Sequence, residues 1–419
     1  MPGPRPWLLA ALVAALFAAR LVAAGTAPSP AEARLENAVV DFVAQQVDTD
    51  LRPDAALRAV AREHSEVLAA GGGIASRDFL RQSESAHGLL DPFPYVFYGS
   101  APGQGLEDLG ARLLGAIARL SGGEKRLYTH VAVGICERRR PWYRRSREPR
   151  YHVTVLLSQR AVSFTPWPQE LRPGERFLFA GEVHPPFREP ELLLTRPDGS
   201  TAVLADLALE PRCFRAYVAF DHGPGAYQLE IMGRYDLGPR VLGLCTLQAH
   251  DPGQSTAYET VLLAARAGTL QRSRPLARIA AAPPASEREA ELRLLHLVNR
   301  DRQRSGLGPL TESPELAALA RTHAADMRDH AFFAHVSPRA GSLAERARAA
   351  GIRYRRLAEN IAVDRDVDAA ETALLHSPGH RLNLLSPDFT QVGVGVAFER
   401  NGGGERRVFV TQSFALPSP

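Results

Sequence analysis

Lysine is almost missing from this chain of 419 residues, because Lys125 is its only lysine among 50 basic residues. Cysteine, methionine and tryptophan are also scarce, with three residues of each. Three cysteines are too few for a scaffold built on disulfides, and the odd count leaves at least one thiol unpaired. A bridge between Cys213 and Cys245 and buried free thiols are both open interpretations.

The chain also has little net charge. Its formal charge of +4 falls to about +2 if Arg5 and Arg20 are removed with a leader, which argues against nucleic acid as a partner. The leader is an apolar run at 7–19 followed by small residues at 23–27, the layout of an export signal. We therefore expect residues 1–27 to be a signal peptide and the protein to be secreted, periplasmic or in the cell envelope. An uncleaved membrane anchor is the alternative, although a span needs about 20 apolar residues.

Hydrophobic patterning divides the rest of the chain into regions of different type. Residues 31–160 combine amphipathic helical stretches at 31–46 and 55–69 with alternating strands at 130–135 and 151–157, which predicts an α+β unit. Residues 162–267 consist of short apolar runs punctuated by turns. This spacing is typical of an immunoglobulin-like β-sandwich.

A segment rich in arginine, alanine and proline at 268–285 is predicted to be a linker before a second α+β unit at 286–419. Ser286 and Glu289 have the spacing of a capping box at the start of a helix, and Ser313-Pro314 marks the start of another. Two apolar runs, 392–398 and 407–414, flank a glycine-rich turn and predict a hairpin.

The C-terminal region also contains a dense series of polar motifs. They are Asn299-Arg300, His323, His335, Glu359-Asn360-Ile361, Ser377-Pro378-Gly379-His380-Arg381, Asn383 and Thr411-Gln412-Ser413-Phe414. In this order, over about 130 residues, they resemble the cysteine-rich secretory, antigen 5 and pathogenesis-related 1 family, abbreviated CAP, in its bacterial form. The resemblance implies an α-β-α sandwich around an antiparallel sheet, with His335, Glu359 and His380 facing a central cleft.

Two neutral imidazoles and one carboxylate can supply three ligands to a divalent metal such as zinc, or bind one another and a ligand by hydrogen bonds. A carboxylate beside imidazoles also makes either a candidate acid or base. His376 is a further possible member, because the second acidic residue of the family cleft has no clear equivalent here. His323, on the apolar face of a predicted helix, is interpreted as a packing residue.

The N-terminal unit resembles the C-terminal one. Residues 57–64 match 316–323 at five of eight positions, 131–134 correspond to 392–395, and 153–155 fall where 408–410 do. We therefore predict a degenerate CAP-like domain at 31–160 without the cleft residues. The expected fold class is α+β, with the β-sandwich between two CAP-like copies.

A basic and aromatic stretch at 138–147 suits an anionic envelope surface. Its arginines are Arg138, Arg139, Arg140, Arg144, Arg145 and Arg147.

The favoured function is a non-enzymatic module that binds a lipid, glycan or peptide in the His/Glu cleft. One alternative is a metal-assisted hydrolase of peptide or cell-wall substrates. The other is an envelope structural or adhesion protein.

Overall fold

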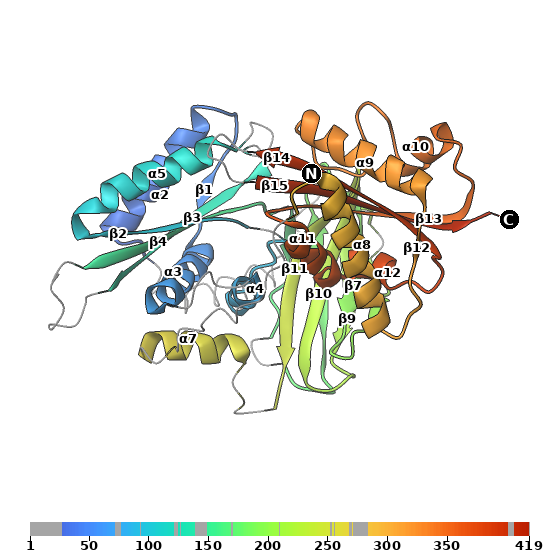
Figure 1. Ribbon diagram of the computed structural model, residues 1–419. Coiled ribbons are helices and arrows are strands. Elements are labelled where there is room, and N and C mark those ends of the chain that lie inside the picture. Colours follow the sequence, from blue (N-terminus) through green and yellow to red (C-terminus); the bar gives the residue numbers. More distant parts are fainter. Residues whose placement is uncertain are drawn as a thin grey trace, which may run out of the picture.

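The computed structural model describes residues 27–418 except 72–76, 93, 121–124, 126, 139–148, 169–170, 209, 252–253, 255, 268–269, 271–283 and 401–405. The predicted signal peptide, nearly all of the predicted linker, and Arg139, Arg140, Arg144, Arg145 and Arg147 lie outside the described residues. No helix within the described ranges is long and apolar enough to cross a membrane. Figure 1 shows the blue N-terminal elements on one side and the orange and red C-terminal elements on the other, with the green strands reaching both.

The C-terminal unit is a sheet with helices on both faces. Its helices are α8 (Glu287–Arg304), α9 (Pro314–Asp329), α10 (Leu343–Ala349), α11 (Val367–His376) and α12 (Pro378–Leu384), and its strands are β12 (Thr311–Glu312), β13 (Tyr354–Asp364), β14 (Gln391–Arg400) and β15 (Arg406–Pro417). The strand order is β12-β14-β15-β13. One apolar cluster joins α8 and α11 to the sheet, and another joins α9 to residues such as Ile361 and Phe409. The predicted α-β-α sandwich is confirmed.

Local sequence signals set the helix starts in this unit. Ser313 accepts a hydrogen bond from the Leu316 amide, with Pro314 at the first helical position of α9. Ser286 caps α8, but Glu289 binds the amide of Ala285 and the capping box is only half formed. The predicted hairpin is confirmed, because β14 pairs antiparallel with β15 along the whole length of β14.

The N-terminal unit has the same strand arrangement. It comprises helices α2 (Pro30–Ala44), α3 (Ala55–Ala70), α4 (Arg77–Ala86) and α5 (Leu106–Ala118), the turn η2 (Gly103–Gly105), and strands β1 (Arg52–Pro53), β2 (Tyr95–Pro102), β3 (His130–Arg138) and β4 (Arg150–Ser158). The order β1-β3-β4-β2 matches β12-β14-β15-β13, including the parallel pairing of the short first strand. The duplication itself stays a prediction.

Two glycines, Gly134 and Gly395, show which strand residues of the N-terminal unit correspond to which strand residues of the C-terminal unit. A Cβ on Gly134 would lie 2.1 Å from the Ala61 backbone, and one on Gly395 would lie 2.2 Å from the Arg321 backbone, at matching positions of α3 and α9. Gly134 pairs with Thr154 and Gly395 with Thr411. The expected match of residues 153–155 to 408–410 is therefore wrong by two positions, because 153–155 correspond to 410–412.

The central region is two antiparallel sheets around one apolar core. The first contains β5 (Val162–Phe164), β6 (Arg176–Val183) and β9 (Cys213–Ala219), and the second contains β7 (Arg188–Thr195), β8 (Thr201–Val203), β10 (Gly225–Tyr235) and β11 (Gly238–Ala249). Aromatic residues such as Phe179, Phe214 and Tyr227 fill the space between them. A β-sandwich therefore lies between the two α+β units. Its immunoglobulin-like character and its domain boundaries stay predictions.

Two expectations about the central region need correction. Residues 257–267 form a helix, α7 (Ala257–Ala267), which packs on the N-terminal unit through Tyr258, Phe79 and Val67. The bridge considered between Cys213 and Cys245 is not formed, since both residues are buried free thiols. Burial raises the pKa of the Cys245 thiol, so this residue behaves as a small apolar side chain.

Candidate functional site

Glu359 lies on β13 at the centre of the candidate cleft, and a buried arginine holds it. Arg346 Nη2 donates to both carboxylate oxygens, at 3.1 Å from Oε1 and 2.9 Å from Oε2. The two side chains are only 4% and 2% exposed, so a buried cation compensates a buried anion. His335 Nδ1 lies 3.1 Å from the same Oε1. The structure thus brings His335 and Glu359 together, as predicted.

Arg346 comes from α10, whose start is fixed by a capping box between Ser342 and Glu345. Its Nη2 also donates to the backbone oxygen of His335 at 3.1 Å, which fixes the loop that carries this histidine. Burial lowers the pKa of Arg346, and Glu359 opposes that effect. Its Nε and Nη1 atoms are buried and have no hydrogen-bond partner among the described residues. Buried donors of this kind bind an ordered water or a ligand oxygen.

His323 lies behind the cleft. Its Nε2 donates to the Ala334 backbone oxygen at 3.0 Å and lies 3.8 Å from Glu359 Oε1. Burial lowers the pKa of His323 to about 4, so the ring is neutral at physiological pH. His323 is buried, as expected for a packing residue, and the Ala334 backbone oxygen is its polar partner. Its closeness to Glu359 was not expected.

His380 belongs to the short helix α12, whereas Glu359 lies on β13. Its Nδ1 lies 2.7 Å from Ser377 Oγ, and its backbone oxygen accepts a hydrogen bond from Asn360 Nδ2 at 3.1 Å. Burial, assisted by the nearby His335, lowers the pKa of His380 to about 3. This imidazole is therefore neutral at physiological pH. Its Nε2 has no hydrogen-bond partner among the described residues.

Asn360 begins a buried chain of polar side chains behind the cleft. Its amide accepts from Asn383 and donates to Gln412, and Gln412 Nε2 donates to Glu371 Oε2 at 2.6 Å. Burial raises the pKa of Glu371 to about 8, so this carboxyl is mostly protonated near neutral pH. The chain fixes the strand and helix positions from which Glu359 and His380 project.

The donor set does not fit a strong metal site in this arrangement. No group of three His, Cys, Asp or Glu side chains within the described ranges could hold a metal ion. Glu359, the only carboxylate of the predicted set, already receives two hydrogen bonds from a buried guanidinium. A divalent cation at this carboxylate would lie beside that positive charge, which is unfavourable. Ligand binding by His335, Glu359 and His380 stays a prediction.

Comparison with known proteins agrees with the motifs and with the fold. Residues 295–414 match the family model described as the cysteine-rich secretory protein family, CAP. The C-terminal unit is a CAP domain. Its α-β-α architecture and the order of its His, Glu and Asn motifs are those expected from the sequence.

Two curated Bacillus subtilis proteins align with the CAP region. The uncharacterized protein YkwD is 38% identical over 113 residues, or 27% of this chain and 44% of YkwD. The uncharacterized membrane protein YlbC is 38% identical over 108 residues, or 26% of this chain and 31% of YlbC. The chain thus spans less than half the length of these relatives.

Among solved structures, an extracellular protein containing an SCP domain from Bacillus anthracis matches 58% of this chain and 67% of its own, with 21% identity and a TM-score of 0.28.

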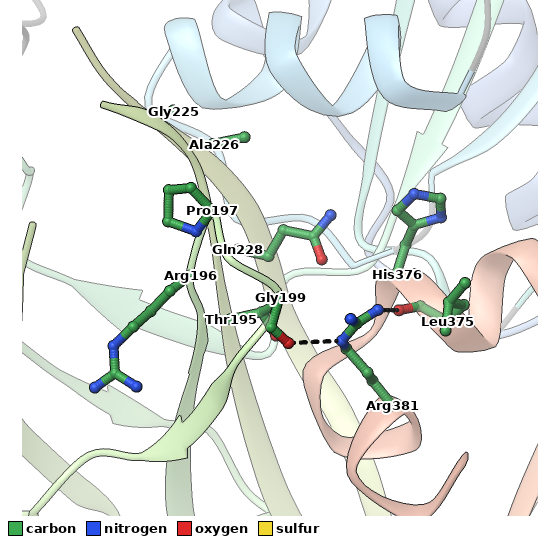
Figure 2. Close-up of a pocket in the computed structure, with 10 residues that line it drawn as sticks. All are labelled: Thr195, Arg196, Pro197, Gly199, Gly225, Ala226, Gln228, Leu375, His376 and Arg381. Carbon is green, nitrogen blue, oxygen red and sulfur yellow. Dashed lines mark hydrogen bonds between the residues drawn. The ribbon is translucent and has the colours of Figure 1, made fainter. Parts of the chain in front are cut away.

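His376 does not join the CAP cleft residues. Its Nδ1 donates to the Thr372 backbone oxygen at 2.7 Å, and its ring lines a separate pocket of about 370 Å³ between α11, α12 and the second central sheet. Figure 2 shows His376 and Arg381 on one wall and Gln228 on the other. The expectation that His376 replaces an acidic cleft residue finds no contact in the structure to support it.

Sequence reasoning missed three residues around the cleft: Arg346, Ser377 and Glu230. Arg346 lies one residue after the capping-box glutamate of α10, and nothing in its spacing distinguished it from the many exposed arginines. Ser377 was noted only as part of a motif. Glu230 belongs to the central sheet, yet its carboxylate binds Ser377 Oγ at 2.5 Å and the Gly379 amide at 2.8 Å. A carboxylate within an apolar strand was the one available signal.

Proposed function

We propose that this chain is an exported protein whose CAP domain binds a ligand, without chemical turnover, in the cleft of His335, Glu359 and His380. The engagement of Glu359 by Arg346 carries this proposal. A general base needs a carboxylate oxygen within reach of a water and free to take its proton. Both oxygens of Glu359 accept hydrogen bonds from a buried guanidinium, which favours a structural and binding role for this carboxylate.

An exposed aromatic side chain close in sequence to His335 favours a lipid over a glycan or a hydrophilic peptide. Phe333, two residues before His335, is 43% exposed. Exposed aromatic and aliphatic side chains beside polar groups are typical of sites for ligands with an apolar part. The open Nε2 of His380 provides a polar contact for a headgroup.

Equilibrium binding to the full chain tests the proposal. The probes are a fluorescent monoacylglycerol, a soluble cell-wall muropeptide and a pool of short peptides. We expect the lipid probe to bind, and the double variant His335→Ala/His380→Ala to bind it at least about tenfold more weakly, a loss of about 1.4 kcal/mol. The matched control is His296→Ala, which replaces an exposed histidine of α8. Failure of all three probes, or equal binding by the double variant, would contradict the proposal.

The metal-assisted hydrolase remains a second candidate because His380 is neutral and its Nε2 is open. A neutral imidazole can accept a proton from water or bind a metal ion. Measured metal content of the purified protein, together with peptidase and muropeptide hydrolase assays on wild type and His380→Ala, tests this candidate. Bound stoichiometric metal and an activity that His380→Ala abolishes would establish it.

We further propose that the chain is organised as predicted, with a signal peptide at 1–27, a degenerate CAP-like domain at 31–160, a β-sandwich from 162 and a linker at 268–285 before the CAP domain. The shared strand order and the matching glycine contacts support the duplication.

Arg138, the first residue of the basic stretch, donates a hydrogen bond to the Ala69 backbone oxygen. Attachment to an anionic envelope surface through residues 138–147 is a separate proposal, tested by charge reversal and measured cell-surface retention.

A further inference from the structure

Glu230 is a fully buried carboxylate in the central β-sandwich that faces the CAP domain. Along β10, Tyr227, Leu229 and Ile231 alternate into the sandwich core, so Glu230 projects from the opposite face of the sheet. That face would be solvent-exposed in an isolated sandwich. Here α12 of the CAP domain covers it, and Glu230 is 0% exposed.

The carboxylate of Glu230 binds two groups at the start of the Ser-Pro-Gly-His motif. Its Oε2 accepts from Ser377 Oγ at 2.5 Å, and its Oε1 accepts from the Gly379 backbone amide at 2.8 Å. An added Cβ on Gly379 would lie 2.8 Å from Oε1, so a side chain at this position would displace the Glu230 carboxylate. Ser377 Oγ in turn lies 2.7 Å from His380 Nδ1. Glu230, Ser377 and His380 thus form a continuous chain of hydrogen bonds.

The single hydroxyl proton of Ser377 fixes the direction of this chain. An ionised Glu230 can only accept, so Ser377 donates its proton to Glu230 and has only lone pairs left for His380. His380 Nδ1 must then be the donor to Ser377 Oγ. In a neutral imidazole this leaves Nε2 without a proton, as a hydrogen-bond acceptor.

We propose that Glu230, a residue outside the CAP domain, is a positioning residue of the CAP cleft that holds His380 in the Nδ1–H tautomer and thereby selects ligands presenting a hydroxyl or amide hydrogen to Nε2. The ligand part of this inference rests on the proposed binding function. The tautomer part does not, because it concerns the free protein.

The charged groups around Glu230 set the conditions of the test. Burial raises the pKa of Glu230 to about 7, while the hydrogen bonds from Ser377 and Gly379 and the positive charge of Arg81 on α4 lower it, and Glu191 on β7 raises it. The measurement is therefore made at pH 8.5, where Glu230 is mainly ionised. His380, with its low pKa, is neutral there.

The direct test is the tautomeric state of His380 in the full chain, measured by nitrogen-15 NMR with labelled histidine and assigned by the loss of one signal in His380→Asn. Wild type is expected to show the Nδ1–H form. In Glu230→Gln the amide oxygen can still accept from Gly379 while the amide NH₂ donates to Ser377, so Ser377 donates to His380 and the Nε2–H form should appear. Glu191→Gln, an exposed neighbour on β7, is the control and should leave the Nδ1–H form.

An Nε2–H form in wild type, or an unchanged Nδ1–H form in Glu230→Gln, would overturn the inference. If Glu230→Gln does not fold, Ser377→Ala interrupts the same chain and should also remove the exclusive Nδ1–H form. Retention of that form in Ser377→Ala would overturn the inference equally.

Ligand selection is tested with a fluorescent monoacylglycerol and its dimethyl ether, which lacks hydroxyl hydrogens. Wild type should favour the hydroxyl form by about tenfold, the effect of one hydrogen bond, and Glu230→Gln should lose that preference. Equal affinity of wild type for the two probes would overturn the selection role. If neither probe binds wild type while the tautomer responds as expected, the proposed function fails for lipids and the positioning role of Glu230 stands.

Discussion

Buried ionisable side chains define the CAP cleft at the scale of single residues. Arg346 neutralises Glu359, and His323 and His380 are held neutral by burial. Glu371 is kept protonated behind them. Each of these groups is costly in isolation and is stable only because its neighbours supply the missing charge or hydrogen bond.

Replacing Arg346 by a neutral residue should show how strongly the buried Glu359 carboxylate depends on the guanidinium for its stability. We expect Arg346→Met to lower the free energy of unfolding of the CAP domain by about 3–5 kcal/mol, because it leaves a buried carboxylate without its counter-charge. Arg348→Met, at an exposed position of the same helix, should change it by less than about 0.5 kcal/mol. Adding Glu359→Gln to Arg346→Met should restore part of the loss. Urea unfolding measures these values, and a loss below about 1 kcal/mol for Arg346→Met would contradict the expectation.

Glu371 should make stability depend on pH in a defined direction. Its pKa rises from 4.5 to about 8 on folding, so between these values the unfolded chain releases a proton that the folded chain keeps. Wild-type stability should therefore fall as pH rises through this window, by about 1.4 kcal/mol per unit from this group alone. In Glu371→Gln that component is absent, and its thermal midpoint relative to wild type should rise between pH 5 and pH 8.5. Glu107→Gln, exposed on α5, is the control, and a constant difference would sink the assignment.

Close packing of helices on glycine-bearing strands is the main feature at the scale of elements. Gly134 on β3 and Gly395 on β14 let α3 and α9 approach the sheet until helix backbone touches strand backbone. Backbone cannot move aside as a flexible side chain can. The same close approach in both α+β units supports the proposed duplication more strongly than the match between their helix sequences does.

Gly395→Ala and Gly134→Ala should each destabilise their own unit by about 3 kcal/mol or more, because the new methyl group would overlap the helix backbone. Gly115→Ala is the matched control, since its Cβ would meet nothing within 4 Å on the exposed side of α5. That change should stabilise by about 0.5–1 kcal/mol through helix propensity. Equal effects of Gly395→Ala and Gly115→Ala on the unfolding midpoint would refute the close-approach argument.

Local patterns predicted much of the fold and only part of the site. Helix caps such as Ser313 and the alternation of the β14–β15 hairpin are encoded within a few residues, so periodicity reveals them. The partners of Glu359 and His380 depend on distant elements, since Arg346 arrives on another helix and Glu230 from another sheet. In the structure, the alternation of side chains along β10 puts Glu230 on the outer face of the sheet. Only tertiary structure shows that this face is covered.

At the scale of the whole molecule, the second central sheet joins the two α+β units. Leu244 and Glu230 are cross-strand partners and share its outer face. The Leu244 amide donates to the Leu90 backbone oxygen beside α4, and Glu230 binds the start of α12. At the tip of the β10–β11 hairpin, Leu237 accepts from the Val336 amide at 3.0 Å, next to His335. Parts of the CAP cleft are thus held in place from outside the CAP domain.

The most direct test of ligand binding without metal chemistry is the affinity of the full chain for the fluorescent monoacylglycerol, measured before and after exhaustive dialysis against a chelator. We expect the same affinity in both samples, with a loss of at least about tenfold in His335→Ala/His380→Ala. Because Arg346 supplies the counter-charge of Glu359, chelation should not alter the cleft. Binding that disappears on chelation and returns with zinc would show that the cleft needs a metal, contrary to the proposed function.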